Sequence, residues 1–357
     1  MNRPITRPLV PEDVSRRASP AVYLARAATA HLRSFTTGMT PANAAKAMYG
    51  EGDRVTPLII RAATSAATTQ QTGWAAELAQ RAVLATIQDA ASISAGAAII
   101  ARSLSLDLGR LAQLSVPSRP LTSADGAHFL AEGSAIPVRA FNFAAGTLRP
   151  YGMKTITTYS RELSESSGIE AVVKQTLAES FGLGIDAAML SASAGTASQP
   201  AGLFQSAPIG PTAGGGAAAM FGDIKALFAA LAQNGAGANI VIVVPLPQAA
   251  GLKAQLGVKW DWPIFTSTAM AANSVGAVDL TSFVSGFTSE VEFSVSKAAA
   301  LHMESSTPAD IVSGGGALAV PVKSAFQTEI LALRSTMHLS WVMRVAGHAQ
   351  LVTNCTW

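Results

Sequence analysis

The longest regular pattern of hydrophobic positions in this chain is helical. From Ile169 to Leu190, apolar or small residues recur every three or four positions, which predicts a helix of roughly 33 Å at about 1.5 Å per residue. Ser167 and Glu170 fit a capping box at its start, and Glu170 is expected to pair with Lys174 one turn later. The face expected to be buried consists of Ile169, Val173, Leu177, Phe181, Gly184 and Ala188.

Shorter helices are predicted where a capping residue precedes an apolar pattern. Ser, Thr and Asp are favoured before the first turn of a helix, Pro is favoured at its first position, and Gly is favoured after its last. By these rules we expect helices from Pro20 towards Ser34, from Pro41 to Gly50 after Thr40, from Trp74 to about Ala91, from Ile224 to Asn234 after Asp223, and after Pro247.

Strands are predicted where hydrophobic and polar residues alternate. The clearest case lies near the end of the chain, where the odd positions are apolar and the even positions are polar, so one face of the strand should be buried. The buried set is Leu331, Leu333, Met337, Leu339, Trp341 and Met343, opposite Arg334, Thr336, His338, Ser340 and Arg344. Further strands are expected within ARSLSLDLGRL (101–111), MKTITTYSREL (153–163), IVIVV (240–244), WPIFTS (262–267) and EVEFSV (290–295).

The composition indicates that much of the surface should be buried against other chains. Charged residues make up 13% of the sequence and hydrophobic residues 49%, whereas about 25% of an ordinary soluble domain is charged. A membrane is a poor explanation, because the apolar run 240–244 ends at Pro245 and a span needs about 20 residues. No signal peptide is recognised at the N-terminus, so we expect assembly in the cytoplasm. The single cysteine, Cys355, rules out an intrachain disulfide.

Charge is distributed unevenly along the chain. The first 72 residues carry eight arginines and Lys46 against four acidic residues, a net charge of +5 in a chain with a formal net charge of +3. The segment from Ala62 to Thr72 is rich in Ala, Ser, Thr and Gln, which is typical of a linker. Residues 1–72 are therefore interpreted as a basic N-terminal arm.

The order of several short motifs resembles a known family. FLAEGSAIP (129–137) is followed by the returning strand MKTITTYSREL, by the long helix and by the turn PAGL (200–203). This order resembles that of tailed-bacteriophage major capsid proteins with the Hong Kong 97-like fold. In that family an EG motif opens a projecting hairpin, the E-loop, a strand closes it, and a long spine helix follows.

The resemblance implies an α+β fold in which a peripheral domain contains the spine helix and an axial domain meets its copies at a symmetry axis. On this basis we divide the chain into 1–72, the basic N-terminal arm; 73–130, the N-arm helix and the start of the peripheral domain; 131–157, the E-loop; 158–216, the peripheral domain with the spine helix; 217–320, the axial domain; and 321–357, the return to the peripheral domain.

The resemblance also implies a structural function. The family's subunits form the hexamers and pentamers of an icosahedral phage or prophage head that encloses double-stranded DNA, so the expected location is the virion capsid after assembly in a bacterial host. Expected partners are further copies of the chain, scaffolding, portal and decoration proteins, and packaged DNA bound without sequence specificity. An encapsulin-type nanocompartment shell shares the fold and would enclose proteins instead. A hydrolase with an unrecognised site is the alternative from another class, and electron microscopy would separate shell from enzyme.

The sequence lacks a recognisable catalytic spacing. The candidate site residues are therefore contact residues, and they come from the predicted hairpin. The sequence contains no G-x-S-x-G, no phosphate-binding G-x-x-x-x-G-K-[ST] and no H-E-x-x-H, so no catalytic, cofactor or metal site is predicted. Glu132, Arg139 and Arg149 are expected to contact a neighbouring subunit. Some relatives join subunits through an isopeptide bond from a lysine near the E-loop tip, but no lysine lies between Ala131 and Met153.

Overall fold

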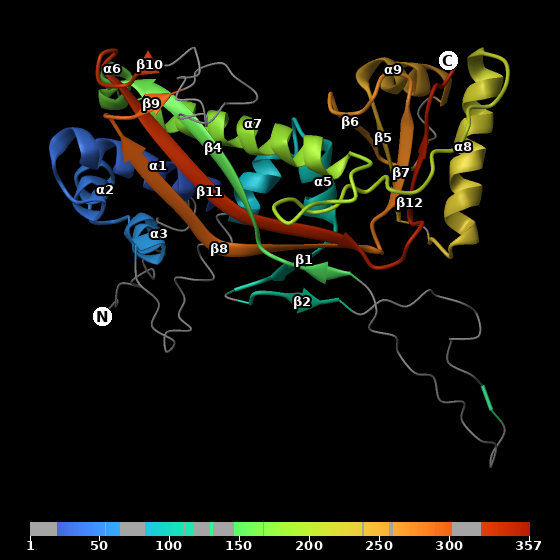
Figure 1. Ribbon diagram of the computed structural model, residues 1–357, viewed down its shortest axis with the longest axis horizontal. Helices are drawn as coiled ribbons and strands as arrows, with labels where there is room; N and C mark the ends of the chain where they lie inside the picture. The colour runs from blue at the N-terminus through green and yellow to red at the C-terminus, as the bar shows by residue number, and fades with distance from the viewer. Residues whose placement is uncertain are drawn as a thin grey trace, which may run out of the picture.

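A computed structural model describes residues 20–53, 55–64, 83–109, 111–116, 129–130, 146–166, 168–237, 239–256, 260–301 and 323–357. The described part is elongated: three helices lie at one end, a long sheet runs along the middle, and a smaller sheet with its own helices lies at the other end (Figure 1). It combines helices with two four-stranded sheets, as the α+β prediction requires.

The N-terminal helices are α1 (Pro20–Thr37), α2 (Pro41–Tyr49) and α3 (Val55–Thr64). The first two were predicted, and the Thr40 hydroxyl accepts a hydrogen bond from the Asn43 amide, as an N-cap should. The sequence analysis missed α3, whose last residues fall in the predicted linker. Leu24 and Leu32 of α1 are buried in the main core, so residues 20–64 form a helical cluster packed on the body of the protein.

The long sheet has the strand order β1-β8-β11-β4, formed by β1 (Leu104–Asp107), β8 (Phe283–Ser296), β11 (Ile330–Met343) and β4 (Tyr151–Ser160). β1 runs parallel to β8, and the other neighbours are antiparallel. The predicted apolar face of β11 is buried apart from Met343, which is half-buried. Thr336 and Ser340, on the face predicted to be solvated or in contact with a neighbour, are buried as well, because β11 has a paired strand on each side.

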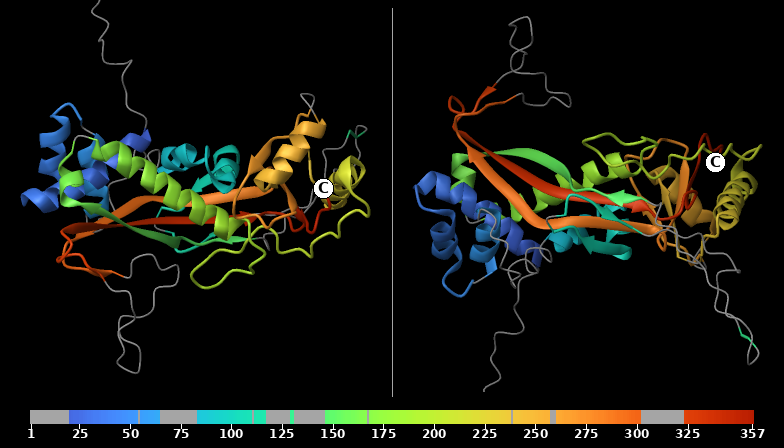
Figure 2. Two further views of the ribbon diagram at one scale, coloured as in Figure 1. Left: turned by 90° about the horizontal axis from the view of Figure 1, so that it is seen from above. Right: turned by 60° about the horizontal axis from the view of Figure 1, so that its bottom comes forward.

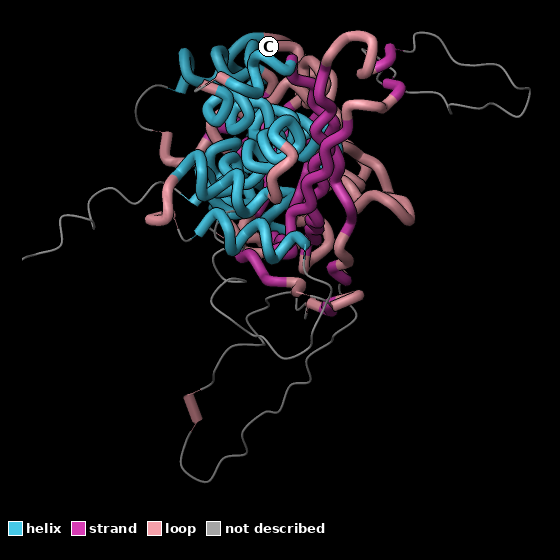
Figure 3. The backbone as a smooth tube through the Cα atoms, turned by 90° about the vertical axis from the view of Figure 1, so that its left-hand side faces the viewer, coloured by secondary structure: helices cyan, strands magenta, loops and turns pink. Residues whose placement is uncertain are grey.

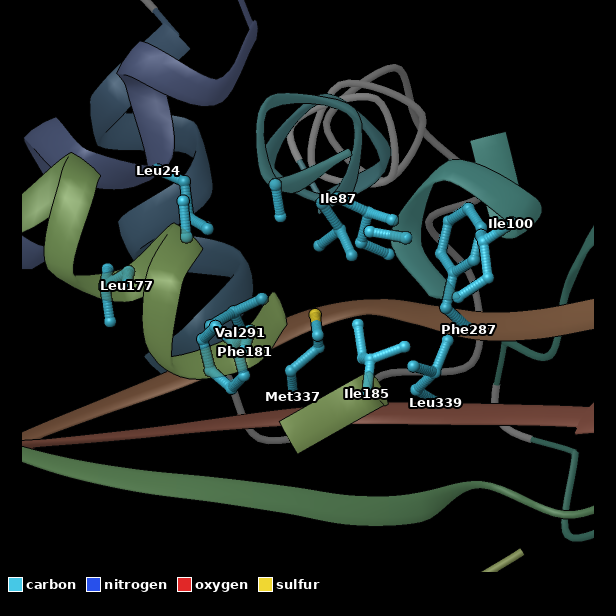
Figure 4. Close-up of a cluster of buried hydrophobic side chains, with 14 of the residues drawn as sticks. Leu24, Ile87, Ile100, Leu177, Phe181, Ile185, Phe287, Val291, Met337 and Leu339 are labelled. Atoms are coloured by element: carbon cyan, nitrogen blue, oxygen red, sulfur yellow. The ribbon is translucent and has the colours of Figure 1, made fainter. Parts of the chain in front are cut away.

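In the described part of the chain, helices cover one face of the long sheet (Figures 2 and 3). The longest is α7 (Ile169–Met189), close to the predicted span. Its buried stripe follows the prediction through Phe181 and then continues through Ile185 and Met189 instead of Gly184 and Ala188. α5 (Ala95–Arg102), which was not predicted, packs beside it, and residues 83–90 form the described part of the helix expected over 74–91. Figure 4 shows the resulting core, with Leu24, Ile87, Ile100, Leu177, Phe181, Ile185, Phe287, Val291, Met337 and Leu339.

The smaller sheet has the order β12-β7-β5-β6, formed by β12 (Ala349–Val352), β7 (Val275–Asp279), β5 (Ile240–Val244) and β6 (Ile264–Thr266). β5 is the predicted IVIVV strand and is buried at every position. α8 (Gly216–Gln233) and α9 (Leu246–Leu256) pack against this sheet around a second core. Four short strands and one short helix complete the described elements: β2 (Leu114–Ser115), β3 (Thr147–Leu148), β9 (Ala300–Leu301), β10 (Lys323–Ser324) and α6 (Arg161–Glu165).

Two strands join a sheet other than the one expected from their position in the chain. β8 was assigned to the block 217–320, but it pairs with β1 and β11 in the long sheet. β12 was assigned to the returning segment 321–357, but it pairs with β7 in the smaller sheet. The chain therefore crosses between the sheets three times: between β4 and β5, after β7 and after β11.

Three predictions about the helix termini are wrong. α8 begins at Gly216, so Asp223 lies inside the helix and not at its start. At the start of α7 the N-cap is Gly168, without a side-chain cap, and Ser167 lies outside the described residues. Glu170 contacts Arg26 instead, and Lys174 pairs with Asp89 at 2.9 Å rather than with Glu170. In each case a residue distant in the sequence provides a partner that local spacing cannot reveal.

Candidate intersubunit surfaces

Of the three predicted contact residues, one can be located. Glu132 and Arg139 lie outside the described residues. Arg149 is exposed between β3 and β4, and no described residue forms an ion pair with it. Its guanidinium is therefore free to meet a carboxylate of another chain, which leaves the proposed contact role open.

The face of the long sheet that no described helix covers is polar. Its side chains are exposed on β4 and around Glu292 of β8, whereas Thr336 and Ser340 of the central strand β11 are buried. Side chains of β8, β11 and β4 form rows across this face, and one row contains Glu292, Thr336 and Lys154. The next row contains Ser294, Arg334 and Ile156. Ile156 is a large apolar side chain on this polar face. In the single chain, 56% of it is exposed.

Exposed apolar side chains also gather at the end formed by the smaller sheet. The ring centroids of Phe228 and Trp262 are 4.9 Å apart, and those of Trp260 and Trp262 are 5.0 Å apart. Phe221, on the same helix as Phe228, is half exposed, and Leu246 at the start of α9 is 71% exposed. Phe228 and Trp260 are half-buried against the second core, so Trp262, Phe221 and Leu246 are the apolar side chains that a partner could reach here.

A groove of about 400 Å³ lies where the PAGL turn meets the end of β11. The Trp341 indole donates a hydrogen bond to the Ala201 carbonyl at 2.8 Å, which fixes the turn against the strand. Gly202 is required there, because an added Cβ would lie 2.0 Å from the Ser191 carbonyl oxygen. The family motif PAGL therefore has a structural explanation as a close approach between two backbones.

Asp186 is a buried carboxylate that connects three parts of the fold. It accepts hydrogen bonds from the Ser94 hydroxyl at 2.5 Å and from the Ala95 and Gly96 amides at 3.2 and 2.7 Å, all at the start of α5. It also accepts one from the Ser267 hydroxyl, just after β6 of the smaller sheet, at 2.5 Å. The sequence analysis missed this residue, although a lone carboxylate within the apolar stretch 181–190 was the available signal.

A second buried polar group lies where the chain crosses between the sheets. Nδ1 of His348 is 3.1 Å from the Asp279 carboxylate and 2.5 Å from the Ser282 hydroxyl, and Nε2 is 2.8 Å from the Asn234 carbonyl oxygen. The Gly237 amide also donates to Asp279. The histidine and the aspartate are both buried, so this group joins the end of α8 to the crossings after β7 and after β11. A serine, a histidine and an aspartate occur together here, but the hydroxyl is buried and both ring nitrogens are engaged inside the protein.

Asp223 holds the last residues of the chain against α8. Its carboxylate accepts hydrogen bonds from the Thr212 amide at 2.6 Å and from the Trp357 indole at 2.8 Å. Cys355 packs in the same core, where burial and the Asp223 carboxylate raise the pKa of its thiol to about 12. The thiol is therefore protonated at neutral pH, which agrees with its interpretation as an unreactive residue.

Arg26 connects the N-terminal helices to α7. It pairs with Asp53 at 3.0 Å and with Glu170 at 3.3 Å, and its guanidinium lies over the Tyr49 ring. Burial alone would lower the pKa of Arg26, but the two carboxylates raise it above its ordinary value. Burial, with Glu170 nearby, raises the pKa of Tyr49 to about 12. These ion pairs therefore join α1 to the start of α7 and to Asp53.

Two further features are absent from the described residues, a metal-binding cluster and a membrane-spanning helix. No group of three or more His, Cys, Asp or Glu side chains among them is arranged to hold a metal ion. No helix in the described part of the chain is long and apolar enough to cross a membrane.

Comparison with known proteins gives one family and several structures. A model of the phage capsid family matches residues 98–250. No curated protein matches the chain. The procapsid structure of satellite phage P4, which includes a size determination protein, is similar with a TM-score of 0.50 and 9% identity, over 78% of this chain and 100% of that chain. A protein of Microbacterium phage Oxtober96 has a TM-score of 0.49 and 15% identity, over 73% of this chain and 90% of that chain.

The family match and the P4 structure agree with the resemblance found in the sequence. The matched segment 98–250 contains the E-loop motif, the returning strand, the long helix and PAGL. The similarity to the P4 structure adds that the mixed helix and sheet fold is that of a phage capsid structure.

Proposed function

We propose that this chain, which matches the phage capsid family over residues 98–250, is a major capsid protein that assembles into the hexamers and pentamers of an icosahedral head. The family match is the observation that carries the proposal. The head would enclose double-stranded DNA, and the subunits would assemble in the cytoplasm of a bacterial host before becoming part of the virion.

The surface of the chain supports a role in which one subunit contacts several others. Only 13% of the residues are charged, and exposed apolar side chains lie on separate parts of the molecule, among them Phe35, Ile156, Leu246 and Phe326. A stable interface buries about 1,200–2,000 Å² in total. Several separate contact areas suit a closed shell better than a single dimer interface does.

We assign the domains of the family to the two sheets. The long sheet with α7 would be the peripheral domain, and the smaller sheet with α8 and α9 would be the axial domain. This assignment moves β8 to the peripheral domain and β12 to the axial domain. The E-loop would span 131–157 and pack on a neighbouring subunit, with Glu132, Arg139 and Arg149 in contact with it.

The N-terminal residues have a separate proposed role. Residues 1–72 carry a net charge of +5, so the basic side chains of this segment, whose helices α1, α2 and α3 pack on the body of the protein, would help to screen the phosphates of packaged DNA. The alternative is that the segment only joins neighbouring subunits. Scaffolding, portal and decoration proteins would be the other partners of the shell.

Electron microscopy of the purified protein tests the main proposal. We expect capsomers or closed particles, with light scattering that shows multimers over a range of salt and protein concentrations. A strictly monomeric protein under all these conditions would overturn the proposal. Nuclease protection of DNA inside purified heads would test enclosure separately, since empty shells would leave the capsid role intact.

A further inference from the structure

Among the described strands, β4 forms the longest open edge of the two four-stranded sheets. β4 is the last strand in the order β1-β8-β11-β4, and among the described residues only β11 pairs with it. It is 10 residues long. The other edge strands in the two four-stranded sheets are shorter: β1 and β12 have 4 residues each and β6 has 3.

The sequence of β4 does not protect this edge. Exposed edges are usually protected by proline, by bulges or by several charges, because their free N–H and C=O groups can pair with another strand. β4 reads YGMKTITTYS, with no proline and with Lys154 as its only charged residue. Its pairing with β11 runs without a bulge from Ser160 opposite Ile330 to Tyr151 opposite Leu339. Thr155, Ile156, Thr157 and Thr158 form a β-branched run that favours an extended strand.

We propose that β4 pairs antiparallel with β4 of a second copy of this chain, across a twofold axis that passes through Ile156. The two long sheets would then form one continuous sheet. This pairing goes beyond the proposed function, because a capsid shell does not require it.

The register follows from the side chains of β4. A twofold axis perpendicular to the sheet keeps each side chain on its own face, so even residues must lie opposite even residues. With the axis at Ile156, residues 152–160 all pair, Lys154 lies opposite Thr158, and the two exposed isoleucines cover each other. An axis at Lys154 would place two ammonium groups opposite each other and would pair only residues 151–157. An axis at Thr155 would leave Ile156 beside a lysine.

A second copy is the partner that fits these observations. The strand is complementary to itself in this register, since its only charged side chain meets a threonine hydroxyl. On each side of the axis, Arg334 lies one strand further in, beside Ile156, so the arginines of the two copies stay apart. The low charge of the whole chain also favours contacts between copies.

Cysteine cross-linking tests this pairing directly. In Ile156→Cys, the two introduced thiols would lie opposite each other with Cβ atoms about 4.5–5.5 Å apart, so oxidation or a short bis-maleimide should give a covalent dimer on a non-reducing gel. The matched control is Ser294→Cys, which is exposed on the same face two strands further in. Its two thiols would be separated by five strand spacings, roughly 24 Å. The wild-type chain controls for Cys355, which is buried.

Dimer formation by Ile156→Cys well above that of Ser294→Cys would support the proposal. Equal or absent cross-linking in the two variants would overturn it. A second variant, Ile156→Lys, should keep the circular dichroism spectrum of the wild type and lose the paired state in sedimentation, and unchanged pairing would count against the proposal. The proposed function is tested separately: Ile156→Cys particles that form without the cross-link would refute the pairing alone, and cross-linked dimers that never form shells would refute the capsid role alone.

Discussion

Asp186 shows how a single residue can hold separate elements together. Its carboxylate accepts four hydrogen bonds, three from the start of α5 and one from the loop after β6, while it projects from α7. Because the residue is only 2% exposed, water cannot replace any of these bonds. Buried acceptors of this kind contribute strongly, since losing one partner leaves the remaining polar groups unsatisfied.

We therefore predict that Asp186→Asn destabilises the unassembled subunit by about 2–3 kcal/mol, because the amide nitrogen would face donors and could not accept their hydrogen bonds. Glu179→Gln is the control, since it makes the same chemical change on the exposed side of the same helix and should cost less than about 0.5 kcal/mol. Urea unfolding of both variants provides the measurement, and equal midpoints would contradict the assigned role of Asp186.

Cys355 provides a prediction that depends on pH. Burial and Asp223 raise its thiol pKa to about 12, so the folded protein should resist maleimide labelling at pH 8, and the unfolded chain should react rapidly. Below the ordinary pKa of 9.0 the thiol is protonated in both states, and the protein keeps the full contribution to stability. Between pH 9 and 12 only the unfolded chain releases the proton, so stability should fall as pH rises. Cys355→Ala should remove this part of the pH dependence; rapid labelling of the folded protein would contradict the prediction.

At the scale of elements, the helices and strands that could be predicted are those whose pattern is local in the sequence. The span of α7, the buried strand β5 and the alternation in β11 follow from periodicity, because burial on one face imposes it directly. α5 was missed because its residues, AGAAIIAR, are too uniformly apolar to show a period, and all but the last two are buried. Asp223 was taken for a cap because Asp is common there, whereas its partners Thr212 and Trp357 lie outside the helix that contains it.

The candidate surfaces were less predictable than the elements. The sequence analysis placed the contact residues on the E-loop, which is recognised by its motif. Ile156 was visible in the sequence, but its exposure depends on which strand lies at the edge of the sheet, and that order depends on long-range pairing. Asp186 and His348 were missed for the same reason, since their partners are distant in the chain.

The packing of α7 supports a matched pair of substitutions. Leu177 is 1% exposed in the main core, whereas Leu183 on the same helix is 57% exposed. Leu177→Ala should destabilise the subunit by about 2–5 kcal/mol through lost burial and a cavity, and it should reduce the yield of soluble or assembled protein. Leu183→Ala has the same effect on helix propensity and should change stability by less than about 0.5 kcal/mol. Similar losses in thermal unfolding for both variants would mean that the buried face of α7 is wrongly assigned.

At the scale of the whole molecule, the main core continues onto the smaller sheet, where it includes Val241 and Val243 of β5 and Val278 of β7, and a second core lies on the other face of that sheet, against α8 and α9. The chain crosses between the two sheets between β4 and β5, after β7 and after β11. At the last two crossings His348 binds Asp279 and Ser282, and Asp186 joins α7 to the loop after β6. The two ends are therefore linked by buried polar groups as well as by the chain. Intersubunit contacts at the smaller sheet and along the long sheet could in this way be held in a fixed relative geometry.

The bonding between subunits gives the last prediction, which concerns whether the shell is noncovalent. An isopeptide bond needs a lysine amine within reach of a neighbour's amide, but the segment 131–153 contains no lysine. Lys154 lies in β4 within the sheet, and Arg139 and Arg149 cannot replace an amine because a guanidinium stays protonated. Asn354 follows β12 and is exposed near the last residues of the smaller sheet. We therefore expect that boiling purified particles in detergent with reductant releases one band near 36.5 kDa, or a trimmed form of it. A ladder of pentamer and hexamer bands would contradict the prediction, and its disappearance in Lys154→Arg would then identify the donor.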